Sequence, residues 1–156
     1  MTKYMEKHPN WKGLVEEEPS EEQLRDVLAS FDLFLYCGHG SGTKFLPSIE
    51  VQRMECRALA LLFGCSSGKL VQYGKKVEPH GVAYSYLLAG SPGVLGALCV
   101  VTDVDTDLIT QAFLDTWLSG NVDLLSSLVK ARKVAKSPFN AAACIFYGLP
   151  SISLLS

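Results

Sequence analysis

Two Gly-rich segments of the sequence each carry one reactive side chain. His39 lies in the segment 38–42 and Cys65 lies in the segment 64–68. A thiolate is a strong nucleophile, and a neighbouring imidazole can take up the proton of a thiol and lower its pKa. The two side chains therefore predict nucleophilic catalysis by Cys65, with His39 as the general base.

The glycines around His39 have a second catalytic use. Gly40 and Gly42 carry no Cβ that would shield their backbone N–H groups, as an oxyanion hole requires. A plainer interpretation is a satisfied histidine in a turn and a buried cysteine that acts as a small apolar side chain. That interpretation suits either residue alone, whereas the presence of both after strand-like runs favours catalysis.

Two other motifs overlap these segments. Residues 64–68 also fit G-x-S-x-G, the serine elbow of α/β-hydrolases, with Ser66 as the nucleophile. That fold needs its catalytic histidine late in the chain, after the acid, whereas the last histidine here is His80. The segment 38–42 is a weak match to a phosphate-binding loop, because no G-K-[ST] follows it.

The apolar pattern predicts the elements that position His39 and Cys65. The runs 32–37 and 58–63, which precede them, show no polar alternation and are typical of parallel strands buried on both faces. Ligands bind outside the carboxyl ends of the strands in open parallel sheets. We therefore expect both side chains to face one cleft.

The remaining segments complete an α/β plan. Two further strands are predicted at 94–101 and 142–147, and residues 49–52 alternate as in a short edge strand or flap. Residues 1–19 contain no strand-length apolar run, and residues 69–79 predict a surface loop. Apolar periodicity and capping residues predict helices at 21–30, 81–89, 108–118 and 122–135. This order of elements predicts a mostly parallel sheet.

Length and composition exclude several classes of protein. With 156 residues, of which 48% are hydrophobic and 19% charged, the chain has the composition of one globular domain. The net charge of −2 gives no general footprint for nucleic acid. Five cysteines without a C-x-x-C pair argue against a disulfide framework and a zinc site. Since no signal peptide or membrane-length apolar run is visible, we expect a soluble intracellular protein without metal or cofactor.

Other reactive side chains have plainer explanations. His80 precedes a predicted helix, where an exposed or capping role is expected. The remaining cysteines stand in or beside apolar runs and are predicted to be core residues: Cys37, Cys56, Cys99 and Cys144. Three acids after the third strand are expected to cap a helix, or to pair with a basic substrate side chain: Asp103, Asp105 and Asp107.

Taken together, these segments resemble the protease domain of separase, a caspase-like cysteine endopeptidase. Residues 32–42 and 62–68 resemble the two catalytic signatures of the family, and the likeness continues through 81–92 and 101–103. It ends at residues 142–143 and 147–150, and in all it covers about residues 11–151, nearly the whole chain. The resemblance implies a caspase-like three-layer sandwich, in which a central mostly parallel sheet is flanked by helices.

The resemblance also implies the roles of individual residues. His39 would be the catalytic base and Cys65 the nucleophile, and the N–H groups of Gly40 and Cys65 would form the oxyanion hole. Separases cleave after arginine, and the acid that the family assigns to this arginine corresponds to Asp107. The other expected substrate-binding residues are Asp103 and Ser66.

The biological role implied by the resemblance is the separation of sister chromatids. Separase cleaves the kleisin subunit of cohesin, and the inhibitor securin threads the same cleft as a pseudosubstrate. We therefore expect a kleisin substrate, a securin-like partner and a location in the cytoplasm and nucleus. No metal, membrane or direct nucleic-acid partner is expected.

The sequence departs from the separase pattern at several positions. Cys99 and Val100 replace a Trp-Asp pair, and Thr106 replaces an isoleucine near the expected arginine pocket. Residues 140–144 read Asn-Ala-Ala-Ala-Cys where the family usually has Asn-Gly-Ala-Ala-Pro. We expect residues 1–156 to form a single protease domain that lacks the first strand and the large helical scaffold of separases. Such a chain would be a fragment, a partial gene prediction or a reduced paralogue.

These departures leave two alternatives to a separase-type protease. One is a catalytically impaired module that binds securin-like peptides without turnover, because a missing strand or an altered pocket would reduce turnover before it reduced binding. The other is a caspase-like peptidase with a different specificity.

Overall fold

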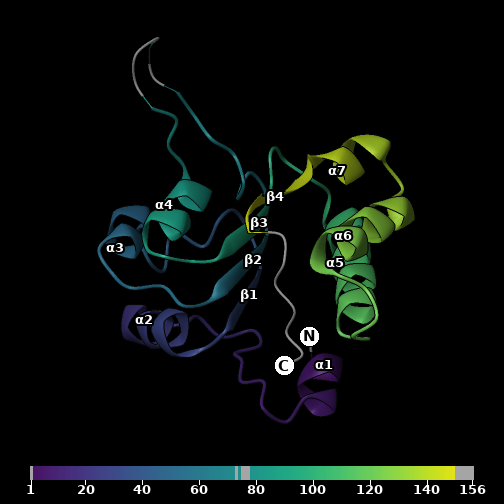
Figure 1. Ribbon diagram of the computed structural model, residues 1–156, viewed down its shortest axis with the longest axis horizontal. Helices are drawn as coiled ribbons and strands as arrows, with labels where there is room; N and C mark the ends of the chain where they lie inside the picture. Colours follow the sequence, from purple (N-terminus) through teal and green to yellow (C-terminus); the bar gives the residue numbers. More distant parts are fainter. Residues whose placement is uncertain (1, 73, 75–77, 150–156) are drawn as a thin grey trace.

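A four-stranded sheet forms the centre of the protein in the computed structural model, which describes residues 2–72, 74 and 78–149. The strands are β1 (Leu33–Cys37), β2 (Leu59–Phe63), β3 (Gly93–Ala97) and β4 (Cys144–Gly148). They lie in the order β1-β2-β3-β4, in which the first three strands are parallel and β4 pairs antiparallel with β3 (Figure 1). The predicted mostly parallel sheet is confirmed.

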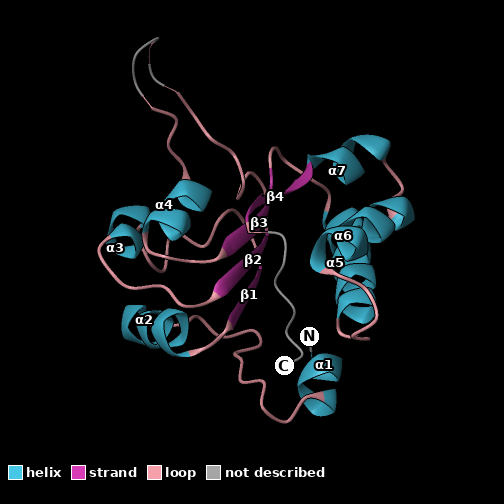
Figure 2. Cartoon of the chain, viewed as in Figure 1, coloured by secondary structure: helices cyan, strands magenta, loops and turns pink. Residues whose placement is uncertain are grey.

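Helices cover both faces of the sheet, which gives the fold three layers (Figure 2). One layer contains α2 (Glu21–Ser30), α3 (Ser48–Gln52) and α4 (Val82–Leu88). The other contains α1 (Thr2–Lys7), α5 (Asp103–Trp117), α6 (Leu124–Ala131), a 3-10 turn (Arg132–Val134) and α7 (Pro138–Ala143). The expected α/β sandwich is therefore confirmed.

Successive side chains of β2 fill two separate cores. Leu59, Leu61 and Phe63 pack against α5 and α6 on one face. Ala60 and Leu62 pack with side chains of α2, α3 and α4 on the other face. Every residue of β2 and of β3 is buried, which explains why the sequences of these strands lack polar alternation.

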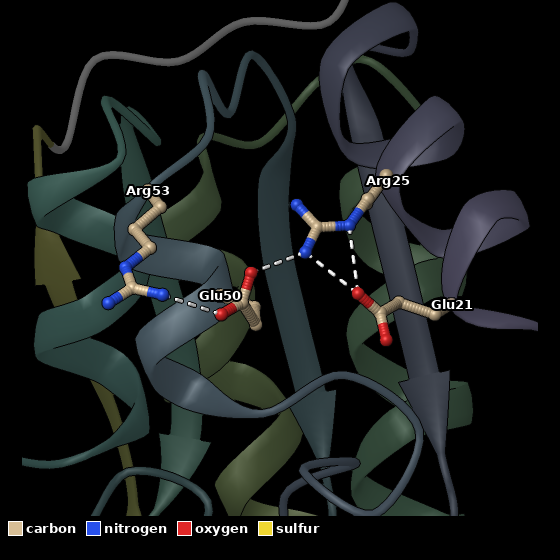
Figure 3. Close-up of polar contacts among 4 residues, drawn as sticks. All are labelled: Glu21, Arg25, Glu50 and Arg53. Atoms are coloured by element: carbon tan, nitrogen blue, oxygen red, sulfur yellow. Dashed lines mark hydrogen bonds and ion pairs between the residues drawn. The ribbon is translucent and has the colours of Figure 1, made fainter.

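An ion-pair network on the surface joins α2 to α3 (Figure 3). Arg25 donates hydrogen bonds to Glu21 of its own helix at 2.7 Å and to Glu50 of α3 at 2.6 Å. Arg53 donates to the second carboxylate oxygen of Glu50 at 2.9 Å. The hydrogen bond from Arg25 is the main cause that holds the pKa of Glu50 below its usual value. The network fixes α3 against α2. The chain segment that starts at His39 leads into α3, so the network also fixes the end of that segment.

The short alternating segment before β2 is a helix, so the prediction of an edge strand or flap at 49–52 is wrong. Only Val51 of α3 is buried, and Gln52 donates a hydrogen bond to Ser85 of α4 at 2.9 Å. Four alternating residues cannot distinguish a strand from one helical turn, and packing against α4 decides for the helix.

Other boundaries also differ from the prediction. β3 ends at Ala97 rather than at 101, α5 begins at Asp103 rather than at 108, and β4 begins at Cys144. Neither α1 nor α7 is predicted from the apolar pattern, because each has six residues and one or two buried side chains. The predicted loop at 69–79 contains Val71, which pairs with His80, and partly lies outside the described residues.

Candidate active site

The turn that carries His39 follows β1 and is open to solvent. The imidazole is exposed, as are Cys37 and Gly38 before it. Tyr36 donates a hydrogen bond from its hydroxyl to the backbone oxygen of His39 at 2.8 Å. Gly40 has a φ of 66°, a left-handed conformation that glycine adopts without strain. The N–H of Gly38 donates to the oxygen of Phe63 at 3.4 Å, so the His39 turn is held both by Tyr36 and by β2.

The turn that carries Cys65 follows β2 and is held by main-chain groups of residues 97–101. The N–H of Ser66 donates to the oxygen of Cys99 at 3.0 Å, and that of Gly68 donates to the oxygen of Ala97 at 2.9 Å. The Cys65 thiol is half-buried and donates to the oxygen of Val101 at 3.4 Å. Residues 98–101 leave the sheet to brace this turn, which is why β3 is shorter than predicted.

Ser66 and Ser67 shape the Cys65 turn from inside. Ser66 is half-buried and has a φ of 56°, a left-handed conformation that is uncommon outside glycine. Ser67 is fully buried, donates to the oxygen of Leu62 at 2.7 Å and accepts from the N–H of Ala97 at 3.0 Å. Its hydroxyl therefore ties the turn to both β2 and β3.

The two turns meet at Gly64. A Cβ at this position would lie 1.9 Å from the oxygen of Gly40 and 2.6 Å from that of Gly38. Only a glycine allows the two backbones to come so close. The two turns thus lie together at the carboxyl ends of β1 and β2, whereas the expectation that both side chains face one cleft stays a prediction. Within the described part of the chain, however, no hydrogen bond joins His39 to Cys65.

Backbone donors are available beside the thiol. Among the described residues, no acceptor takes a hydrogen bond from the N–H of Gly40 or from that of Cys65. These are the two donors expected to form the oxyanion hole. A tetrahedral oxyanion would need two such donors at hydrogen-bonding distance.

Two of the three acids after β3 are exposed on α5. Asp103 and Asp107 are open to solvent on the first two turns of this helix, whose N-cap is Thr102. Loss of solvation around the thiol raises the pKa of Cys37 to about 11, and the negative charge of Asp107 adds to this effect.

The third acid, Asp105, is buried and has a structural role. The sequence predicts a helix cap or a substrate contact at this position and does not predict its burial. Its carboxylate accepts the side-chain N–H of Asn140 at 2.7 Å and the backbone N–H groups of Lys136 and Ser137 at 2.6 and 3.2 Å. These bonds, that from Asn140 above all, lower the pKa of Asp105. No local pattern signals the pair, because α7 is needed to bring Asn140 to α5.

The cysteines outside the Cys65 turn differ in burial. Cys56 and Cys144 are buried, as predicted, and Cys99 is half-buried. The prediction of Cys37 as a core residue is wrong, because it ends the outermost strand of the described sheet and is exposed. His80 is exposed, as expected.

A groove of about 1590 Å³ runs along the outer edge of β1 and reaches the His39 turn. Trp11, Leu33, Tyr36 and His39 are among its lining residues, whereas Cys65 is not. In the described residues no group of three or more histidines, cysteines and acids is placed to hold a metal ion. None of the helices described is long and apolar enough to cross a membrane.

Comparison with known sequences gives one consistent family. The sequence model described as "Separin, protease domain" matches residues 1–106. The chain is 42% identical over 143 residues to separin of Mus musculus, covering 90% of this chain and 7% of that protein. It is 37% identical over 158 residues to separin of Saccharomyces cerevisiae, covering 95% of this chain and 10% of that protein. The chain thus spans a tenth or less of these relatives.

Solved structures agree with the sequence comparison. The structure of the Saccharomyces cerevisiae separase–securin complex at 2.6 Å resolution matches with a TM-score of 0.87 and 36% identity, over 96% of this chain and 10% of that chain. The complex at 3.0 Å matches with a TM-score of 0.80 and 39% identity, over 86% of this chain and 9% of that one. With this fold, these two turns and these relatives, the chain belongs to the separin protease-domain family.

Proposed function

We propose that this chain is a cysteine endopeptidase of the separase type. The observation that carries the proposal is the contact of the two Gly-rich turns at Gly64, which delivers His39 and Cys65 to the same edge of the sheet. Membership of the separin protease-domain family supports the same assignment.

In the proposed mechanism, Cys65 attacks the peptide carbonyl while His39 takes the proton of the thiol. The oxyanion of the tetrahedral intermediate accepts hydrogen bonds from the N–H groups of Gly40 and Cys65. His39 then protonates the leaving amine, and water hydrolyses the thioester. The imidazole must turn toward the thiol when substrate binds, as catalytic hydrogen bonds often tighten only in the bound complex.

The proposed substrate is the kleisin subunit of cohesin, cleaved after an arginine. Asp107 and Asp103 are exposed carboxylates beside the site and suit a guanidinium, with Ser66 as a further substrate contact. Because the solved relatives are separase–securin complexes, we propose a securin-like inhibitor that occupies the same cleft. The corresponding location is the cytoplasm and nucleus.

A second candidate function is peptide binding without turnover. The observation that favours it is the exposed His39 side chain, which makes no hydrogen bond to Cys65 within the described residues. Val100 supports it as well, because this side chain is 73% exposed where separases carry an aspartate. Such a module would hold a securin-like peptide and leave the scissile bond intact.

Covalent labelling distinguishes the two functions. The probe is an acyloxymethyl ketone peptide that ends in arginine, applied to the wild type, Cys65→Ser and His39→Ala. The peptidase predicts an adduct on the wild type that is lost in Cys65→Ser and slowed in His39→Ala. Cys37→Ser is the matched control, since it removes a second cysteine, at the end of the neighbouring strand.

Failure of the ketone to label the wild type would contradict the peptidase function. If the folded wild type fails to react while a small thiol reagent still modifies Cys65, the peptidase function is wrong for this chain. A securin-like peptide that then binds without being cleaved would establish the binding module.

A further inference from the structure

A second thiol, that of Cys99, lies beside the proposed nucleophile and has no part in the proposed mechanism. The side chains of Cys65 and Cys99 are both half-buried and pack against the same small cluster. That cluster consists of Ala97, Val101 and Ala143. Two of these three neighbours are alanines, so the two thiols share one small apolar cluster.

The backbones of the two cysteines are joined by one hydrogen bond. The N–H of Ser66 donates to the oxygen of Cys99 at 3.0 Å. The Cα of Cys65 and the Cα of Cys99 are each two covalent bonds from one of these atoms, so they are at most about 8 Å apart. A disulfide needs a Cα separation of about 4.4–6.8 Å, which this upper bound allows.

We propose that Cys65 and Cys99 form a reversible disulfide when hydrogen peroxide oxidises the protein. The Cys65 thiolate attacks one peroxide oxygen, which yields a sulfenic acid and releases water after protonation. The sulfur of Cys99 then displaces the hydroxyl group as a second water and the S–S bond forms. Two thiols lose two electrons in total, and one peroxide is reduced to two waters.

Cys144 is the alternative partner for Cys99, and its environment disfavours it. This thiol is buried and donates to the oxygen of Asn140 at 3.9 Å. Burial raises the pKa of Cys144 to about 11, although the positive charge of Arg132 acts in the opposite direction. A thiol that stays protonated reacts slowly in disulfide exchange. The less buried Cys65 is therefore the site of oxidation.

The proposed disulfide would give Cys99, a departure from the separase pattern, a regulatory role. Cys99 stands where separases carry a tryptophan, so the second thiol is a feature of this chain. A bond to Cys99 removes the nucleophile from the site until a dithiol reductant releases it. This consequence rests on the proposed peptidase function, whereas the disulfide itself does not.

Peptide mapping tests the disulfide without any activity measurement. The full chain is treated with hydrogen peroxide, its free thiols are alkylated, and it is digested without reductant for mass spectrometry. We expect a linked peptide pair that contains Cys65 and Cys99 in the wild type and in Cys144→Ser, and none in Cys99→Ser. A link between Cys99 and Cys144, or Cys65 oxidised to sulfinic acid without a link, would overturn the proposal.

Labelling by the arginine ketone tests the consequence. After peroxide, wild-type labelling should fall by roughly tenfold or more and return with dithiothreitol, because the disulfide is reducible. Cys99→Ser should lose labelling without recovery, because its sulfenic acid proceeds to sulfinic acid. Equal recovery in both proteins contradicts a protective disulfide. If the reduced protein never labels, the peptidase function fails, and the peptide map alone decides on the disulfide.

Discussion

The two Gly-rich turns carry the two proposed catalytic residues, and they are built differently. The Cys65 turn is bonded to residues 97, 99 and 101 and has a buried serine inside it. The His39 turn is exposed at Gly38 and His39, and its supports are the hydroxyl of Tyr36 and one backbone hydrogen bond from Gly38 to Phe63. The nucleophile is therefore fixed by the fold, whereas the base depends on its contact with the other turn and on bound substrate.

The largest effect is expected where the two turns touch. Gly64→Ala would place a Cβ 1.9 Å from the oxygen of Gly40, so the turns must separate. We expect a loss of about 3 kcal/mol in the free energy of unfolding. Labelling by the arginine ketone should be abolished even where the variant remains folded. Urea denaturation and mass spectrometry of the adduct measure the two effects.

Gly40→Ala is the matched control for this substitution. No atom lies within 4 Å of a Cβ at Gly40, and the strain comes only from its φ of 66°. The cost should be about 1 kcal/mol. If both substitutions destabilise the protein equally, the close contact between the two turns is not the reason why a glycine is needed at position 64.

The next substitution tests whether the hydrogen bonds between α5 and the segment that contains α7 help to hold the side of the site that carries Cys65. Asp105→Asn keeps the shape of the side chain but removes the charge that accepts three N–H groups. Because the folded pKa of Asp105 is lowered, its contribution to stability is present above the unfolded pKa of about 3.9 and is lost as the pH falls below it. The variant should be less stable at neutral pH and should lose less stability on acidification. Parallel pH profiles of unfolding in urea for both proteins would contradict this role.

Two serine-to-alanine substitutions, one in each turn, compare the stability of the two turns directly. Ser67→Ala leaves the buried N–H of Ala97 without its acceptor and should cost about 2 kcal/mol. Among the described residues, the hydroxyl of Ser41 in the His39 turn hydrogen-bonds only to that of Thr43. Ser41→Ala should therefore change stability by less than about 0.5 kcal/mol. Thermal unfolding of both variants checks the comparison, which fails if the two shifts are equal.

A smaller effect than that of Ser67→Ala is expected from Tyr36→Phe. It removes the hydrogen bond to the oxygen of His39 and should cost about 0.5–1 kcal/mol, because the bond is exposed. Its influence on the rate of labelling should exceed its influence on stability, since the imidazole loses its local support. A variant that labels at the wild-type rate would mean that Tyr36 does not position the base.

The sequence was informative where structure is local and periodic. Continuous apolar runs predict the central strands, and the glycines after them mark the turns of His39 and Cys65. The pairing of Asp105 with Asn140 was not predictable, because these residues meet only after α7 packs on α5. Cys37 was misassigned because an apolar run does not reveal whether its strand is central or outermost in the described sheet.

The order of the strands has a consequence for the synthesis of the protein. Neighbours in the described sheet are also neighbours along the chain, so each strand can pair with one that the ribosome has already released. The Cys65 turn is completed only by main-chain groups of residues 97–101, which are translated later. A nascent chain that stops before residue 97 would contain both His39 and Cys65. It would still lack the hydrogen bonds that hold the turn of Cys65, the proposed nucleophile. The fold thus delays the maturation of the thiol until the third strand has been made.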